Sequence, residues 1–141
     1  MFSIFKKKST EEQIRKNLFD LLAELEKNLE FFYVMDQRQF ITNGFLTDVW
    51  PRVKGMDIIK RHESILIYAK ATEDFNLSLK AYKEYESWYT GDVKNKTPEG
   101  SRKLHALKHD LDQRLRGMEA VIIPAGQDLE REMLQLGLLK A

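Results

Sequence analysis

Glycine and proline interrupt this chain at few points, and their positions limit the folds that it can adopt. The sequence contains seven glycines and three prolines, and most of them fall in three short stretches, at residues 42–44, 89–100 and 123–126. Because both residue types disfavour the interior of a helix, the long intervals between these stretches can form long helices. The β-branched run at 121–123 is too short to build a sheet. The chain is therefore predicted to be all-α.

The first interval carries a single apolar stripe. Ser9 and Glu12 have the spacing of a capping box, as do Thr10 and Gln13, so a helix is expected to begin near these residues. Apolar residues then recur at steps of three and four, the period of one helix face: Ile14, Leu18, Leu21, Leu22, Leu25, Leu29 and Phe32. The pattern predicts a helix over about residues 10–42.

The middle interval has an apolar face that changes direction. A helix start is expected near residues 48–51, where proline suits a first turn, and Gly55 can introduce a kink. Residues 56–89 contain no glycine or proline, which favours one long helix. Its apolar residues fall into two sets that point in nearly opposite directions. The first set is Ile58, Ile59, Ile65, Leu66 and Ala69, and the second is Ala71, Phe75, Tyr82, Tyr85 and Tyr89. Either the helix breaks near Thr72, or its middle is buried on both sides.

The last interval opens with Thr97 and Pro98, an N-cap followed by proline at the first helical position. A clean apolar stripe follows at helical spacing: Leu104, Leu107, Leu111, Leu115, Met118 and Ile122. Pro124 is expected to end or kink this helix. A last amphipathic piece is expected over residues 127–139.

The order of these stripes suggests the architecture. Long stripes joined by short turns predict an antiparallel up-and-down bundle of three long helices, or of four if the middle segment breaks near Thr72. A chain of 141 residues can bury a core without disulfides. Residues 9–141 are therefore expected to form a single bundle domain, preceded by a flexible apolar and basic segment at residues 1–8.

Composition argues against several functional classes. The chain has 23 basic and 22 acidic residues, so its net charge of +1 creates no overall field toward nucleic acid, and such a partner is not expected. Cysteine is absent, which rules out disulfides, thiol catalysis and zinc–thiolate sites. The sequence contains no run of about 18 apolar residues, the length that a helix needs to span a bilayer. A cytoplasmic location is therefore expected.

Three histidines and one aspartate form the candidate metal site. His105 and His109 are four residues apart and Asp112 follows three later, a spacing that places ligands on one helix face. With His62 from another helix, the pattern resembles the metal site of DinB-type four-helix bundles. Helix geometry opposes this assignment, because His109 faces away from the leucine stripe. If the middle helix is unbroken, His62 also lies roughly 30 Å beyond the level of the other two, and only a sharp reversal near Thr72 would bring the three together. No metal or other cofactor is expected, and His62 is interpreted as a core residue satisfied by a hydrogen bond.

Arg102 and His109 form the candidate catalytic pair. An arginine, a short spacer and a histidine near the start of a late helix resemble the motif of HEPN-type helical ribonucleases. The resemblance implies that the arginine holds phosphate and the histidine moves protons, in a site completed across a dimer. It covers two residues, and Lys103 stands where that family prefers a small polar residue. One alternative function is therefore a metal-binding or ribonuclease-like helical enzyme that uses Arg102, His105, His109 and Asp112.

The first eight residues combine large apolar side chains with consecutive lysines. Each lysine near an anionic membrane surface contributes about 1 kcal/mol to binding, and the apolar side chains could insert weakly. A second alternative is therefore a peripheral membrane adaptor at the inner face of the membrane. Its candidate contacts with a membrane or a partner are Phe2, Ile4, Phe5, Lys6, Lys7 and Lys8.

The leading functional expectation is a non-enzymatic helical module that binds proteins and self-associates as a homo-oligomer. It rests on the extended apolar stripes and on the absence of a convergent polar site. Consecutive aromatic residues around Phe31 and Tyr33 add to it, because they cannot all face one core and one of them can contact a second subunit.

Overall fold

The computed structural model describes the backbone of residues 2–38, 41 and 43–140, and their side chains from residue 10 onward. Within this part the chain forms helices and no strand, so the predicted all-α fold is confirmed. The long helices are connected by short single-turn ones. In chain order they are α1 (Phe2–Arg38), α2 (Trp50–Val53), α3 (Asp57–Lys60), α4 (Glu63–Gly91), the 3₁₀ turn η1 (Val93–Asn95), α5 (Pro98–Arg116) and α6 (Met118–Gln135).

Helix α1 is longer at its N-terminus than the capping pattern predicts. It begins at Phe2, so the residues expected to cap it near residue 10 lie inside the helix. It ends at Arg38, before the predicted end near residue 42. Residues 39, 40 and 42 lie outside the described part. The predicted apolar stripe faces the core, and its most buried members are Leu18, Leu21, Leu25 and Phe32.

The middle segment breaks earlier than the sequence suggests. Helices α2 and α3 are single turns, and α4 begins directly after His62, whose backbone is extended with φ −107° and ψ 101°. Helix α4 then passes Thr72 without interruption. The Thr72 hydroxyl is buried and donates to carbonyl oxygens of its own helix, those of Tyr68 and Ala69. The predicted alternative of a break near Thr72 is therefore wrong.

The apparent change of face has a simple cause. Ile58 and Ile59 belong to α3, so their directions do not continue along α4. Leu66, which the sequence places on the inner arc, is 39% exposed. Within α4 the buried residues form one stripe at steps of one, three and four: Ile65, Tyr68, Ala69, Thr72, Phe75 and Leu79.

Helix α5 begins as predicted. The side chain of Thr97 accepts a hydrogen bond from the N–H of Gly100 at 3.0 Å, which confirms the N-cap, and Pro98 occupies the first turn. The leucine stripe is also confirmed. Leu111 and Leu115 are buried, whereas Leu104 and Leu107 nearer the N-terminus are half-buried.

The C-terminal helix breaks at Gly117, not at Pro124. Helix α5 ends one residue before Gly117, α6 starts one residue after it, and α6 continues through Pro124. Proline removes one helical hydrogen bond. The flanking residues Ile122 and Ala125 are buried in the core, and their packing keeps the helix intact across the missing bond.

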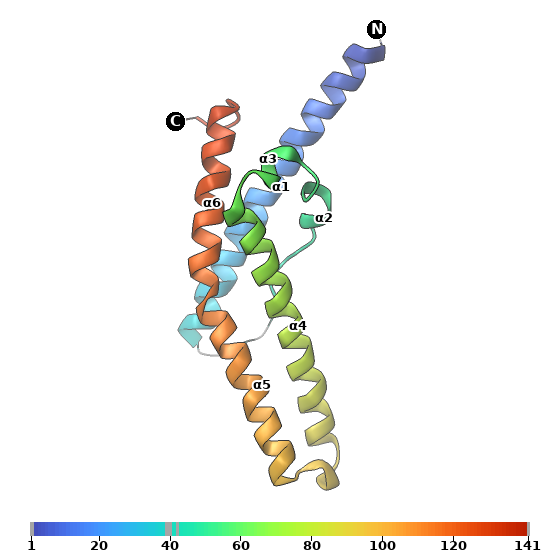
Figure 1. The fold of residues 1–141 in the computed structure, drawn as a ribbon, viewed down its shortest axis with the longest axis vertical. Coiled ribbons are helices and arrows are strands. Elements are labelled where there is room, and N and C mark those ends of the chain that lie inside the picture. Colours follow the sequence, from blue (N-terminus) through green and yellow to red (C-terminus); the bar gives the residue numbers. More distant parts are fainter. Residues whose placement is uncertain (1, 39–40, 42, 141) are drawn as a thin grey trace.

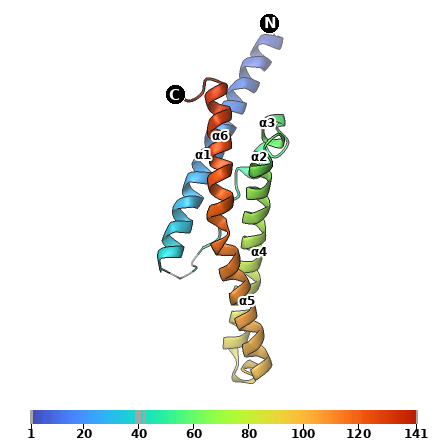
Figure 2. The same cartoon turned by 60° about the vertical axis from the view of Figure 1, so that its left-hand side comes forward.

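Helix α6 packs against both α1 and α4, while α5 packs mainly against α4. Helices α1 and α4 run in the same direction, and α5 with α6 runs back (Figures 1 and 2). This order is possible because the connector, residues 43–62, returns the chain along the molecule before α4 begins. An antiparallel up-and-down order of three or four helices is therefore not confirmed.

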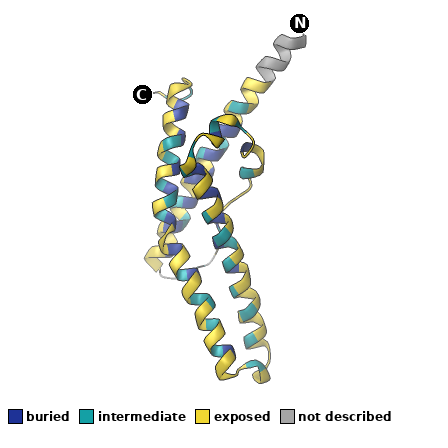
Figure 3. Cartoon of the chain, in the orientation of Figure 1, coloured by how far each residue is buried: buried dark blue, intermediate teal, exposed yellow. Residues whose placement is uncertain are grey.

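Burial divides the molecule into two parts (Figure 3). In the three-helix region, formed by α1, residues 63–79 of α4 and α6, each helix has a buried stripe. In the hairpin region, residues 80–107, every described apolar side chain is half-buried or exposed. The core therefore lies where three helices meet, and the hairpin extends beyond it as two helices and a turn.

Candidate functional site

The two histidines of α5 predicted as candidate metal ligands form hydrogen bonds within their own helix. His105 and His109 are both exposed. His105 Nδ1 lies 2.7 Å from the carbonyl oxygen of Ser101, and His109 Nε2 lies 3.2 Å from the side-chain nitrogen of Gln113. Within the described part of the chain, no group of three or more histidine, aspartate or glutamate side chains is placed to hold a metal ion.

The remaining candidates on α5 are also engaged locally or exposed. Asp112 forms an ion pair with Lys108 at 2.8 Å. Arg102 is exposed near the start of α5, and its Cα lies about 10 Å along the helix axis from that of His109. Lys103, beside it, holds its ammonium 4.7 Å from the centre of the Tyr85 ring. Arg102, His105 and His109 therefore lie on an exposed face of α5, whereas Asp112 is half-buried and lines a separate pocket together with Met35 and Ile41.

His62 has a partner that the sequence does not identify. Its Nε2 lies 3.0 Å from Oε1 of Glu132 on α6, and Arg61 approaches the same oxygen at 3.2 Å. Glu132 is buried and His62 is half-buried. The hydrogen bond agrees with the interpretation of His62 as a satisfied structural residue. This hydrogen bond connects the start of α4 to α6. His62 itself is far in sequence from the other two histidines.

The N-terminal candidates lie within the first turns of α1. Helix α1 includes residues 2–8, but the side chains of Phe2, Ile4, Phe5, Lys6, Lys7 and Lys8 lie outside the described part, and their predicted contacts stay a prediction. Among the helices that the structure describes, none combines the length and apolar character needed to cross a bilayer.

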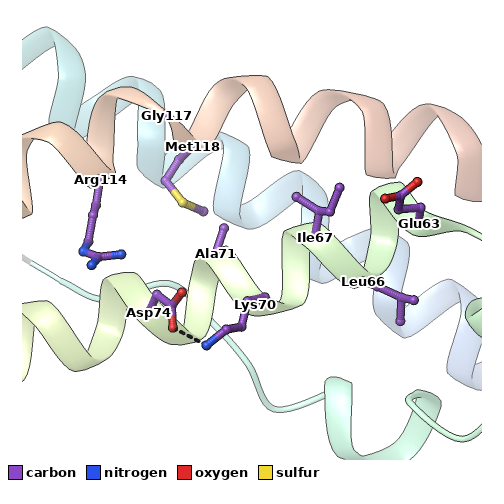
Figure 4. Close-up of a pocket in the computed structure, with 9 residues that line it drawn as sticks. All are labelled: Glu63, Leu66, Ile67, Lys70, Ala71, Asp74, Arg114, Gly117 and Met118. Carbon is purple, nitrogen blue, oxygen red and sulfur yellow. Dashed lines mark hydrogen bonds and ion pairs between the residues drawn. The ribbon is translucent and has the colours of Figure 1, made fainter.

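An open groove of about 550 Å³ runs between α4 and the junction of α5 and α6 (Figure 4). Met118 of α6 and Ala71 of α4 point toward each other across it. Ile67 continues the apolar wall along α4 and is 48% exposed, and Leu66 stands at the outer edge. Large aliphatic side chains exposed next to each other at a groove are typical of a contact surface.

Charged side chains of both signs border this groove. Lys70 Nζ lies 2.8 Å from Asp74 Oδ1, and this contact raises the pKa of Lys70. Arg114 contributes the charge on the α5 side. Glu63, at the other end, forms no ion pair with any residue that the structure describes. Along α4 the order of the exposed stripe is therefore acidic, apolar, apolar, basic, acidic.

The connector is held by two buried or half-buried asparagines. Asn76 accepts from the N–H of Phe45 at 2.8 Å and donates to the carbonyl of the same residue at 2.8 Å. Asn28 accepts from the N–H of Leu46 at 2.8 Å and donates to its carbonyl at 3.0 Å and to the Tyr68 hydroxyl at 2.6 Å. The two side chains satisfy backbone groups of Phe45 and Leu46, which belong to no helix or strand.

Glu24 of α1 fixes the next part of the connector. Its Oε2 accepts a hydrogen bond from the N–H of Val49 at 2.9 Å, and its side chain is buried. Burial raises the pKa of Glu24, although backbone hydrogen bonds and Arg52 partly oppose the rise. The connector therefore packs on the core through polar groups as well as through Phe45 and Val49.

The polar contacts of the connector had a signal in the sequence. Asn28 and Glu24 fall on the same face of α1 as Leu21, Leu25 and Phe32, where a solvated residue does not fit. A polar residue in such a stripe predicts a buried hydrogen-bond partner. The identity of that partner depends on how the connector folds back, which periodicity does not show.

Comparison of the chain with protein-family models, with curated proteins and with solved structures finds no match. The geometry of the chain itself must therefore support any functional argument. Within the described part of the chain, the groove beside α4 combines exposed aliphatic side chains with charged residues in a defined order.

Proposed function

We propose that this chain is a non-enzymatic helical interaction module that self-associates through the exposed stripe of α4. The observation that carries the proposal is the sequence of groups along that stripe. Glu63, Leu66, Ile67 and Lys70 lie on one helix face and border the open groove. The two apolar side chains are flanked by the negative charge of Glu63 and the positive charge of Lys70. Asp74, which pairs with Lys70, lies one turn beyond these four residues.

This order is complementary to itself when two copies of α4 meet antiparallel. If the two-fold axis passes between residues 66 and 67, residue i of one copy faces residue 133 − i of the other. Glu63 then faces Lys70 of the second copy, and Leu66 faces Ile67. A two-fold interface uses the same patch on both copies, so both charge pairs form together.

The groove gives this arrangement room. Helices commonly associate by packing the side-chain ridges of one helix into the grooves on the surface of another. The second copy's Leu66 and Ile67 would contact Met118 and Ala71 along the groove floor. A stable interface buries roughly 1,600 Å² in total, and this apolar centre is small. We therefore expect a weak, concentration-dependent dimer.

Charge reversal at the two flanking residues tests the pairing directly. Glu63→Lys places two like-charged lysines opposite each other at both ends of the interface, and Lys70→Glu does the same with glutamates. Each single variant is expected to weaken dimerisation by about tenfold or more, since like charges across an interface are costly. The double variant restores opposite charges and should recover most of the affinity, as measured by sedimentation equilibrium.

Two controls separate this interface from unspecific association. Leu134 on α6 is 42% exposed and does not line the groove, so Leu134→Ser should leave the dimerisation constant nearly unchanged. Leu66→Ser should weaken it. A wild-type protein that stays monomeric throughout the concentration range, or a double variant as weak as the single ones, would contradict self-association through α4.

A further inference from the structure

A second pocket lies on another side of α4, beneath the connector. It has a volume of about 360 Å³, within the range of sites for small organic molecules. Residues 47–51 of the connector, which include the start of α2, contribute one wall, α4 forms the other, and α1 contributes one residue. The lining includes Glu24, Trp50, Pro51, Tyr68, Ala69 and Leu77.

Glu24 is the most buried charged group of this pocket, at 6% exposure. The Val49 N–H donates to its Oε2 and the Asp48 backbone also hydrogen-bonds to the carboxylate, but no ion pair among the described residues includes Glu24. Arg52, which acts on it through space, is held elsewhere, with Nη1 at 3.1 Å from Asp20 Oδ2. A buried carboxylate without a counter-ion is unfavourable, and a cation that reaches it gains the missing charge pair.

The walls around this carboxylate are mainly apolar. Trp50 is half-buried and presents an aromatic surface, while Ala69 and Leu77 supply aliphatic contacts from α4. An aromatic ring near a cation adds a favourable interaction of about 0.5–2 kcal/mol. At the mouth, Glu73 and Lys80 carry opposite charges, so they do not reverse the negative character that Glu24 gives to the interior.

We propose that this pocket binds a small organic ammonium ion with an apolar body. The ammonium group donates to the carboxylate of Glu24, and the apolar body lies between Trp50 and the α4 wall. The site is separate from the exposed stripe of α4 and does not depend on self-association.

The comparison of 2-phenylethylammonium with 2-phenylethanol tests this assignment, because the two probes differ in the group that would meet Glu24. Binding is followed by the fluorescence of Trp50 in a Trp88→Phe background, since the exposed Trp88 is the other tryptophan. The ammonium probe should give a saturable change and bind about tenfold or more tightly than the alcohol, as expected for a charge-assisted hydrogen bond.

Glu24→Gln should reduce the affinity for 2-phenylethylammonium to that for the alcohol. The introduced amide retains an oxygen that can accept from the Val49 N–H, so circular dichroism should show an intact fold. Glu73→Gln, which removes a carboxylate at the pocket mouth, should change the affinity by about twofold or less, because exposed charges are screened. The assignment would be overturned if the protein with Glu24 intact bound the two probes equally, or gave no saturable response to either. This outcome does not depend on how the Glu24 variant folds.

Discussion

The three-helix region and the hairpin region share helix α4 but differ in what lies opposite it. In the three-helix region α4 faces α6 and the connector, and its side chains Ile65 and Phe75 are fully buried. In the hairpin region α4 faces only α5 and the short turn η1 among the described elements, and Trp88 is 52% exposed. Two helices cover only one face of each other, so aromatic residues there stay partly in water however apolar the sequence is.

The two regions also use polar groups differently. Asn28 and Asn76 hold the connector of the three-helix region through buried or half-buried hydrogen bonds. The polar contacts of the hairpin are mainly exposed, such as the hydrogen bond within α4 from the Tyr82 hydroxyl to Glu86, which raises the pKa of Tyr82 to about 12. Exposed contacts contribute little because water competes for them. The stability of the chain should therefore depend on the three-helix region.

The largest effect is expected from removing a core side chain of that region. Phe75 is completely buried and its ring centre lies 4.9 Å from that of Phe45. Phe75→Ala should lower the free energy of unfolding by about 3–5 kcal/mol, as truncation of buried aromatic residues does. Leu107→Ala, in the half-buried hairpin, should cost roughly 1 kcal/mol, because less apolar surface is lost.

Urea denaturation followed by far-UV circular dichroism measures both values. The wild type and Leu107→Ala serve as references for the slope of the transition. If the two substitutions proved equally destabilising, the hairpin would be as well packed as the three-helix region, and the division drawn from burial would be wrong.

Much of this contrast can be predicted from the sequence, and the part that cannot has a physical reason. The stripes of α1 and α5 and the cap at Thr97 follow from local spacing, because helix periodicity and capping are local properties. The break at Gly117 in place of Pro124 does not. Buried residues flank both positions, Leu115 and Met118 around Gly117 and Ile122 and Ala125 around Pro124, so neither local spacing nor local burial distinguishes them. The position of the break depends on how α5 and α6 lie against α4, which is a property of the whole fold.

The candidate site shows the same limit. Periodicity places the exposed residues of α5, such as His109, correctly in solvent because their own helix has one clean stripe. It misplaces Leu66 because the sequence does not reveal the break before Glu63, and with it the face that α4 leaves open. The partners of Asn28 and His62 lie 18 to 70 residues away, at Leu46 and Glu132, beyond the reach of periodicity.

A smaller but substantial effect is expected from removing one asparagine of the connector. Asn28→Ala leaves the N–H and carbonyl of Leu46 and the Tyr68 hydroxyl without that partner. Unsatisfied buried groups cost about 1–3 kcal/mol, and we expect a loss of about 2–3 kcal/mol. Asn95→Ala in the hairpin is the matched control, since its side chain donates to the exposed carbonyl of Trp88. It should cost roughly 1 kcal/mol or less, because water replaces that bond.

Thermal and urea unfolding of the two asparagine variants would show the difference. Hydrogen exchange at the Leu46 amide gives a second readout, because loss of Asn28 should expose this amide while the core of α6 stays protected. An Asn28→Ala protein as stable as Asn95→Ala would show that the connector does not depend on its asparagines.

The smallest expected effect is a pH dependence that has opposite signs at two carboxylates. Burial raises the pKa of Glu24 above its ordinary value of 4.5, so the folded chain binds more protons than the unfolded chain in the interval between the two values. Stability that depends on Glu24 is therefore present below pH 4.5 and falls as the pH rises through the folded-state pKa. The stability of wild type relative to Glu24→Gln should decrease across this interval and then stay constant.

Asp110 of α5 provides the contrast within the same titration. Hydrogen bonds from Arg114 and Ser78 lower its pKa below 3.8, so the unfolded chain binds more protons than the folded chain below that value. Its contribution is present above pH 3.8 and is lost on acidification, which means that wild type relative to Asp110→Asn should gain stability as the pH rises. Because Asp110 is exposed, its slope should be shallow and should weaken in salt, whereas the Glu24 slope should persist. Two slopes of the same sign would show that Glu24 is solvated in the folded state. The assignment of Glu24 as a buried carboxylate, which distinguishes the three-helix region, would then be wrong.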